Sequence, residues 1–406
     1  MRLAILTHEP FFPPSGGGSS EAVYLVRELV RRGHTVDVFC PDIPEAESVA
    51  ARFNIRLHLF TGFRMGRYAS LRTPKYLLFP FCLERLFLKT LRNGAQYDLL
   101  LSLHAISAVP AARLKKRLGI PTVMNYLDYL TGFMETWPKW VMPPPVLAAL
   151  MRYEVSLPRR SNADGVLAVS DTLADRVAAT GYPREKIRPI YFGYDAASFP
   201  LTQNGLASRQ SEPPTLVMHG SFDRHHLGPI ALDALARVHA KHPDLNLRFV
   251  GRETPSLGEF LRKLAAAAPG IKTVCTGFVP YTGIAAQLEG ATLGIVPYEE
   301  STGTHCAFVA KLVEYLALGL PVASTRIQSV SQYFKDEPLA RFSDFNGLAF
   351  ANVILGWLAE PQEQRNALAL PAHKSVRERL DWEIVCRNAA AFIEQALPGH
   401  GHAPAM

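Results

Sequence analysis

Residues 305–325, with the sequence HCAFVAKLVEYLALGLPVAST, constrain the fold of this chain more than any other stretch. Apolar residues recur there at helical spacing, Gly319 follows as a stop signal, and Pro321 opens a short apolar strand. A helix that ends in glycine and leads at once into a strand is typical of alternating α/β chains. Lys311 and Glu314 lie three residues apart, so we expect them on one face of this helix.

Lys311 and Glu314 have two possible roles. A cation near a helix start with a carboxylate one turn later suits a nucleotide, because the cation faces the diphosphate and the carboxylate binds ribose hydroxyls. A solvated ion pair on a surface helix has the same spacing. The spacing alone leaves both interpretations open.

The length and charge predict a two-domain globular protein with an anionic partner. At 406 residues the chain is long enough for two hydrophobic cores. It carries 43 Lys and Arg against 36 Asp and Glu, a formal net charge of +7. This excess favours anionic small molecules or an anionic membrane surface. The sequence has no motif that reads RNA or DNA, so nucleic acid is not expected as a partner.

The cysteines and the apolar runs predict a cytoplasmic location. The five cysteines are scattered without a CxxC pair, which argues against a disulfide framework or a zinc site. The N-terminal apolar run is too short for a signal peptide, and no run approaches the roughly 20 apolar residues that span a membrane. Peripheral contact with the inner face of the membrane stays open.

Strand-like and helix-like segments alternate along the chain. Residues 3–6 form a predicted strand that leads through a Gly/Pro/Ser loop into a helix at about residues 21–32. Further predicted strands are TVDVFC, 98–103, 121–126 and 165–169, and a second series with a helix at 306–318 follows a polar linker. The predicted class is α/β, with two Rossmann-like domains facing across a cleft. The predicted divisions are a first domain over 1–197 that includes a C-terminal helix at about 380–397, a linker over 198–214, and a second domain over 215–379.

Five motifs in order resemble those of the GT-B glycosyltransferases, and most closely their family-4-type group. PFFPPSGGGSSEAVYLVRELVRRGHTVDVFCP is similar to that group's Gly-rich loop, helix and strand, and IRPIYFGYDAASF to its exit from the first domain. RFVGRE, TGFVP and KLVEYLALGLPVAST then follow the group's order and rough spacing. The resemblance covers nearly the whole chain. It implies a GT-B fold and sugar transfer from a nucleotide-diphosphate sugar, with a UDP-sugar expected.

Two departures from the group's pattern bear on mechanism. Retaining members usually carry a glutamate eight residues before the one at position 314, where this chain has Cys306. The AKLVEY form is instead similar to the xanthan glucuronosyltransferase, which inverts. The loop HGSFDRHHLG also lacks the usual lysine, so its cationic candidates are Arg224, His225 and His226. Inversion is therefore expected, and a retaining reaction stays open.

The resemblance implies which residues bind the donor. Lys311 and Arg224 would neutralise the diphosphate, and Glu314 would hold the ribose. A core position is the alternative for Phe278, and an ordinary turn is the alternative for the glycine-rich loop. The expected donor residues are Gly16, Gly17, Gly18, Gly220, Arg224, Phe278, Val279, Thr304, Lys311 and Glu314.

Two residues that follow predicted strands are candidates for the catalytic base. Asp128 follows the strand 121–126, and His104 follows the strand 98–103. An inverting enzyme needs a base beside the acceptor hydroxyl. A helix or turn cap is the alternative for Asp128, and a structural role is the alternative for His104. The sequence has no Asp-x-Asp motif, so no metal or other cofactor is expected.

The acceptor side of the first half is basic and aromatic. Residues 63–92 combine cations, among them Arg64, Arg67, Arg72 and Lys75, with aromatic and leucine residues. Residues 133–151 add Trp137 and Trp140. Such a surface suits the headgroup region of a membrane and a lipid-linked saccharide acceptor. A hydrophobic small molecule as acceptor, or a helix packed on the domain core, would use the same residues.

Two other functions fit the same fold. A UDP-sugar 2-epimerase would need no acceptor, and the glycine-rich loop and the aromatic surface favour transfer over it. A non-catalytic partner subunit would keep the fold without the chemistry, and the missing first glutamate keeps that alternative open.

Overall fold

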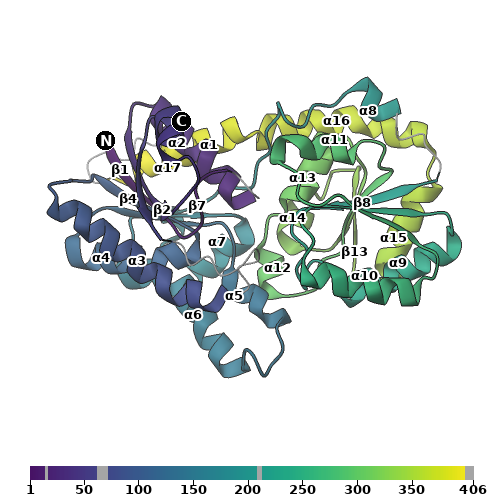
Figure 1. The fold of residues 1–406 in the computed structure, drawn as a ribbon, viewed down its shortest axis with the longest axis horizontal. Coiled ribbons are helices and arrows are strands. Elements are labelled where there is room, and N and C mark those ends of the chain that lie inside the picture. Colours follow the sequence, from purple (N-terminus) through teal and green to yellow (C-terminus); the bar gives the residue numbers. More distant parts are fainter. Residues whose placement is uncertain (14–16, 62–71, 208–212, 398–406) are drawn as a thin grey trace. The chain divides into compact units, whose positions relative to one another are not determined.

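The structure, a computed structural model, describes residues 1–13, 17–61, 72–207 and 213–397 (Figure 1). Contacts divide the chain into two compact units, which we describe separately. Unit 1 comprises Met1–Thr131, Met142–Tyr191 and Val385–Met406, and unit 2 comprises Gly132–Val141 and Phe192–Ile384. The division thus falls at Tyr191 instead of residue 197, and residues 132–141 pack with unit 2.

Unit 1 is built on a parallel sheet whose described strands have the order β3-β2-β1-β4-β5-β6-β7. These strands are β1 (Arg2–Thr7), β2 (Thr35–Pro41), β3 (Arg56–Phe60), β4 (Leu99–Leu103), β5 (Thr122–Tyr126), β6 (Gly165–Ala168) and β7 (Ile187–Pro189). The helices are α1 (Gly17–Arg31), α2 (Ala46–Phe53), α3 (Arg72–Arg92), α4 (His104–Leu118), α6 (Pro144–Ser161), α7 (Asp171–Ala178) and α17 (Trp382–Gln395). A short helix, α5 (Leu130–Phe133), lies at the boundary with unit 2.

The core of unit 1 explains why these segments form a sheet with covering helices. Strands such as LLLSL in β4 are buried along their whole length, as expected for parallel strands covered on both faces. Leu83 and Phe87 of α3 and Leu114 of α4 pack with Leu6 and Phe39 of the neighbouring strands in one cluster. In the described part of the stretch 63–92, Phe79, Leu83 and Phe87 are therefore core residues.

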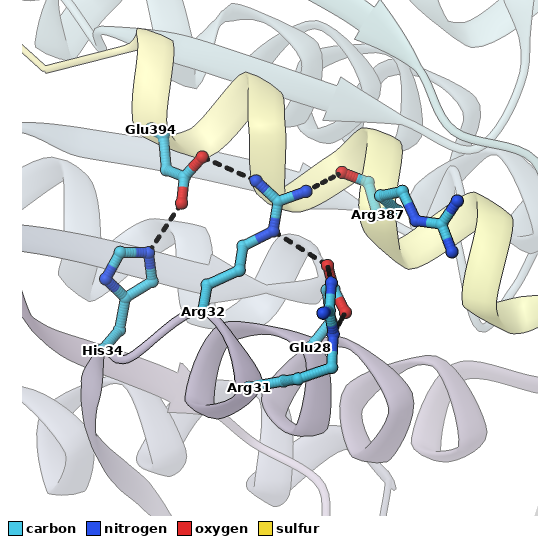
Figure 2. Close-up of polar contacts among 6 residues, drawn as sticks. All are labelled: Glu28, Arg31, Arg32, His34, Arg387 and Glu394. Atoms are coloured by element: carbon cyan, nitrogen blue, oxygen red, sulfur yellow. Dashed lines mark hydrogen bonds and ion pairs between the residues drawn. The ribbon is translucent and has the colours of Figure 1, made fainter.

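The C-terminal helix α17 packs on unit 1 beside α1 (Figures 1 and 2). Arg32 donates hydrogen bonds to Glu28 at 2.8 Å, to Glu394 at 2.7 Å and to the carbonyl oxygen of Arg387 at 3.0 Å. His34 contacts the other Glu394 oxygen at 2.8 Å. Glu28 of α1 thus orients the Arg32 guanidinium, and Glu394 with the Arg387 carbonyl oxygen holds α17 against the end of α1.

Unit 2 is built on a second parallel sheet, with the described strands in the order β10-β9-β8-β11-β12-β13. These strands are β8 (Thr215–His219), β9 (Asn246–Val250), β10 (Lys272–Cys275), β11 (Leu293–Val296), β12 (Val322–Thr325) and β13 (Ala340–Ser343). The helices are α8 (Gln203–Ala207), α9 (Pro229–Lys241), α10 (Pro255–Ala267), α11 (Ile284–Leu288), α12 (Thr302–Cys306), α13 (Ala310–Ala317), α14 (Gln328–Tyr333), α15 (Gly347–Ala359) and α16 (Gln362–Leu380). Helix α8 lies inside the predicted linker.

The helix predicted over residues 306–318 is two helices in the structure. Helix α12 ends at Cys306, and α13 begins at Ala310 after an extended stretch. The break buries Phe308. The centre of its ring lies 5.1 Å from that of Tyr333, the last residue of α14, and 5.9 Å from that of Phe334. Burial of an aromatic ring outweighs the continuation of a helix here.

Candidate active site

In unit 2 the strand order reverses between β8 and β11, and the carboxyl ends at such a switch point are where open α/β sheets bind ligands. Gly220 follows β8 with φ +99°, and Lys311 of α13 packs directly on it. A Cβ at position 220 would lie 2.8 Å from Cε and 2.9 Å from Nζ of Lys311. The structure therefore brings these two predicted donor residues together, and it does so because position 220 has no side chain.

Lys311 is held in a buried, polar position. Its Nζ donates a hydrogen bond to the hydroxyl of Tyr298, which follows β11, at 2.9 Å. Burial lowers the pKa of Lys311 to about 8, although the charges of Glu314 and Asp223 raise it in part. A bound diphosphate would favour the charged form, so this lysine is poised to gain a proton with an anionic ligand.

Glu314 lies on the same helix and is paired with a histidine. It is 4% exposed, and one carboxylate oxygen accepts a short hydrogen bond from Nε2 of His219, the last residue of β8. The aromatic ring of Tyr315 lies 5.0 Å from the His219 ring, edge to face. Glu314 is therefore a partnered, buried group and not a member of a solvated ion pair.

Three other predicted donor residues, Phe278, Val279 and Thr304, lie in two places. Phe278 is 51% exposed, with the guanidinium of Arg252 4.5 Å from its ring centre, so Phe278 is not a core residue. Val279 is half-buried beside it. Thr304 is fully buried, and its amide donates a hydrogen bond to the hydroxyl of Ser301 that caps α12. A contact between Thr304 and the donor stays a prediction.

Arg224 lies on the exposed side of the loop between β8 and α9. It lines a cavity of about 470 Å³ with Leu227 and Glu299, and with Phe260 and Lys263 of α10. Neither Lys311 nor Glu314 lines that cavity. Joint neutralisation of a diphosphate by Arg224 and Lys311 therefore stays a prediction.

The same loop carries the one described group that could hold a metal ion. Asp223, His225 and His226 each offer one ligand atom, and these atoms lie within 4.8 Å of one another. Two imidazoles and a carboxylate suit Zn²⁺ and similar ions. Nδ1 of His226 already accepts a hydrogen bond from the Asp223 amide at 3.1 Å. An ion on Nδ1 would displace that bond, and an ion on Nε2 would leave the ring without a proton.

In unit 1 the strand order reverses between β1 and β4. Thr7 pairs with Leu103, and Leu103 pairs with Asn125 of β5, so the residues after these strands share one edge of the sheet. His104 follows β4 with φ +67°, a left-handed conformation that is rare for a residue with a side chain. Its ring lies 5.1 Å from that of His8, edge to face. The register thus brings His104 to the edge that also carries Asp128.

Asp128 lies two residues beyond β5 and is half-buried. Desolvation by the surrounding protein, with smaller contributions from the charges of Glu9 and Glu154, raises its pKa to about 7. Glu154 of α6 accepts hydrogen bonds from the amides of Leu130 at 2.9 Å and Thr131 at 2.8 Å. Glu154 therefore fixes the loop that carries Asp128. A carboxyl group with a pKa near neutrality can both accept and return a proton.

A fully buried carboxyl group, that of Glu21, lies beside Asp128. Glu21 of α1 accepts a hydrogen bond from Nδ2 of Asn125 at 2.6 Å. Burial raises the pKa of Glu21 to about 8 against that hydrogen bond, and the charge of Asp128 adds to the rise. Gly17 and Gly18 form the first turn of α1, and Gly16 lies outside the described residues.

Sequence reasoning missed Glu21, Glu154 and His219. Each is buried and hydrogen-bonded to a predicted site residue or to the segment that carries one. For Glu154 and His219 the sequence carries no local signal.

Comparisons with known proteins identify related glycosyltransferases. Residues 15–198 match the model of Glycosyltransferase Family 4, and residues 213–360 match the model of Glycosyl transferases group 1. The chain is 25% identical over 401 residues, 98% of each chain, to a GDP-mannose-dependent alpha-mannosyltransferase of Mycolicibacterium smegmatis.

Solved structures show the fold. Sucrose-phosphate synthase from Thermosynechococcus elongatus aligns with a TM-score of 0.77 at 16% identity, over 97% of this chain and 98% of that one. HepE from Anabaena, solved with UDP-glucose, aligns with a TM-score of 0.70 at 17% identity, over 98% of this chain and 100% of that one. The expected GT-B fold is confirmed. The family matches favour a transferase over the alternative of a 2-epimerase. The chain is a glycosyltransferase that uses a nucleotide sugar, and it belongs to the family-4-type group of the GT-B glycosyltransferases.

Proposed function

We propose that this enzyme transfers a sugar from a nucleotide-diphosphate sugar to an acceptor hydroxyl by an inverting, metal-independent reaction. The observation that carries the donor half of the proposal is the packing of Lys311 on Gly220, next to the buried Glu314. This places a cation and a carboxylate at the switch point of unit 2, where a diphosphate and a ribose need them.

Two nucleotide sugars are the first donors to test. The family resemblance favours a UDP-sugar, while the relative from Mycolicibacterium smegmatis is named as GDP-mannose-dependent. Phe278 offers an exposed ring for either base, and Arg252 beside it adds a cation and hydrogen-bond donors. We keep the UDP-sugar as the proposed donor and GDP-mannose as its named competitor.

The chemical step that we propose uses Asp128 as the base. The Asp128 carboxylate takes the proton of the acceptor hydroxyl, and the freed oxygen attacks the anomeric carbon of the donor. The bond from that carbon to the diphosphate oxygen breaks, and the nucleoside diphosphate leaves with its charge balanced by Lys311. His104 is the second candidate for the base. The support is the raised pKa of Asp128 and its place at the sheet edge.

A nucleotide-release assay tests this proposal. The protein is incubated with UDP-sugars and GDP-mannose, with and without a lipid extract as acceptor and with and without a chelator. Proton NMR then gives the anomeric configuration of the product. We expect release from one donor, inversion, and loss of transfer with retained donor binding in Asp128→Asn. Retention of configuration would contradict the inverting mechanism, and loss of activity with chelator would contradict metal independence.

The absence of release with every donor would favour a non-catalytic partner subunit. Such a subunit keeps the fold without the chemistry, so it should still fold stably. A circular dichroism spectrum and a cooperative thermal transition of the same sample separate this outcome from a misfolded preparation.

We further propose a lipid-linked saccharide as acceptor, reached by peripheral contact with the cytoplasmic face of a membrane. Leu77 and Phe81 of α3 are 66% and 58% exposed, and the guanidinium of Arg113 lies 4.9 Å from the Phe81 ring centre. Exposed apolar side chains beside a cation suit an anionic headgroup layer. Among the residues that the structure describes, no helix is long and apolar enough to cross a membrane. Arg64 and Arg67, predicted to take part, lie outside the described residues.

Co-sedimentation with vesicles tests the membrane contact. We expect binding to phosphatidylglycerol vesicles, weaker binding to phosphatidylcholine vesicles, and loss of binding when Leu77 and Phe81 are both changed to Ser. Leu348→Ser in α15, which removes a leucine that is 53% exposed on unit 2, is the matched control. Equal behaviour of the two variants would contradict the contact and favour a hydrophobic small molecule as acceptor.

A further inference from the structure

His219 lies at the end of β8 and contacts Glu314, the residue of unit 2 that we propose binds the donor ribose. It is the last residue of β8, which pairs with β9 on one side and β11 on the other. Its side chain is 3% exposed, and Nε2 bonds one carboxylate oxygen of Glu314 on α13. Its backbone amide donates to the hydroxyl of Tyr315 at 3.1 Å. One residue at the carboxyl end of a central strand thus contacts two consecutive residues of the helix that carries the predicted ribose-binding carboxylate.

The hydrogen bonding assigns a direction to this contact. A carboxylate oxygen accepts, so Nε2 of His219 must be the donor. In the described part of the chain, Nδ1 of His219 has no hydrogen-bond partner, so the only hydrogen bond of the imidazole is the one to Glu314. His219 therefore supplies one fixed N–H that donates to one oxygen of Glu314. Among the described residues, the second carboxylate oxygen accepts no hydrogen bond, and it is left for a ligand.

We infer that His219 is a positioning residue that orients Glu314 toward the ribose hydroxyls of the donor. This inference rests on the proposed function. A carboxylate that binds a vicinal diol must keep its plane, and a free glutamate side chain would rotate between rotamers. The bond from His219 removes that freedom before the donor arrives, so less entropy is lost on binding.

A purely structural role for His219 predicts different behaviour. The ring also packs edge to face on Tyr315, and removal of a buried ring would weaken the contact between β8 and α13. That loss would lower stability and affinity for all nucleotides alike. Orientation of Glu314 instead affects ligands that carry ribose hydroxyls, and it leaves ligands without them unchanged.

The test is a calorimetric comparison of two ligands. One is the nucleoside diphosphate that the wild type binds, and the other is its 2′,3′-dideoxy analogue. We expect the wild type to prefer the ribose form by about tenfold or more, as for a hydrogen bond to a charged group. His219→Phe should abolish this preference. His219→Gln, whose amide can donate from a similar place, should keep it to within about a factor of three.

A matched control separates local from general effects. His239 of α9 is also buried in unit 2, but its Nε2 contacts the carbonyl oxygen of Pro269 at 3.2 Å. His239→Phe should therefore keep the ribose preference. If His219→Phe does not fold, His219→Gln decides: a retained preference supports the inference, and a lost preference overturns it.

The outcomes also separate this inference from the proposed function. A wild type that binds no nucleoside diphosphate contradicts the proposed function itself, and the role of His219 fails with it. A wild type that prefers the ribose form, with His219→Phe showing the same preference, overturns only the role of His219.

Discussion

At the scale of single residues, the proposed donor site depends on the lack of a side chain at Gly220. Gly220→Ala would place a methyl group 2.8 Å from Cε of Lys311 and would strain a backbone with φ +99°. We expect Lys311 to be displaced and the affinity for the nucleoside diphosphate to fall by about tenfold or more, the cost of losing one charge-assisted contact. Calorimetric titration measures the affinity, and thermal unfolding shows whether the variant folds.

Gly258→Ala is the control for that substitution. Gly258 lies inside α10 with no neighbouring atom within 4 Å of an added Cβ. Alanine there should leave affinity unchanged and stabilise the helix by up to about 1 kcal/mol. Wild-type affinity in a folded Gly220→Ala protein would show that Lys311 does not need the space that position 220 leaves.

The candidate site residues that the sequence predicted and those that it missed differ in the sequence separation of the residues they contact. Lys311 and Glu314 are three positions apart, so helical spacing alone puts them on one face. His219 lies 95 positions from Glu314, and Asn125 lies 104 positions from Glu21. Such pairs form only when the sheet and its helices are assembled. Periodicity and local motifs carry no information about them.

At the scale of elements, the contact between α1 and α17 should stabilise unit 1. Arg32→Ala removes hydrogen bonds to Glu28, to Glu394 and to a carbonyl oxygen of α17 (Figure 2). Because Arg32 is partly exposed, we expect a loss of only about 1 to 2 kcal/mol in the free energy of unfolding. A lower thermal midpoint and faster hydrogen exchange in α17 would record it.

Arg387→Ala controls for the loss of a positive charge at this contact. Arg32 bonds the backbone carbonyl oxygen of Arg387, so removal of the Arg387 side chain keeps that hydrogen bond. Stability should change by less than about 0.5 kcal/mol. Equal losses in the Arg32 and Arg387 variants would mean that charge, and not the contact, holds the helix.

The strands that the sequence predicted are mostly central ones, and those that it missed lie at or near sheet edges. β4 and β5 are buried along their whole length, so each reads as an apolar run. β3, β7 and β13 lie at sheet edges, are short or only half-buried, and contain charged residues. The broken helix at residues 306–318 was missed because burial of Phe308 is a tertiary effect.

At the scale of the whole molecule, catalysis should depend on one ionisation in each unit. Asp128 must be deprotonated to act as base, so kcat/KM should rise with pH through about 7. Lys311 must be protonated to balance the diphosphate, so kcat/KM should fall as pH rises through about 8. The resulting plot of kcat/KM against pH is a narrow bell with its maximum between these two values. Initial rates from pH 5.5 to 9.5 measure it.

Lys311→Arg identifies the alkaline limb of that profile. Arginine keeps its charge throughout this range, so the fall above about pH 8 should disappear while the acid limb stays in place. A variant profile that superimposes on the wild type would assign the alkaline limb to another group. A wild-type rate that still rises at pH 9.5 would contradict the role of Lys311 as a cation.

We propose that a nucleotide-diphosphate sugar binds through Lys311 and Glu314 in unit 2. Calorimetric titration of the wild type, Lys311→Met and Glu314→Ala with UDP-sugars and GDP-mannose tests this binding directly. We expect saturable binding of one donor by the wild type and a loss of affinity of about tenfold or more in each variant. A wild type that binds no donor, or variants that bind it as tightly as the wild type, would contradict this binding mode.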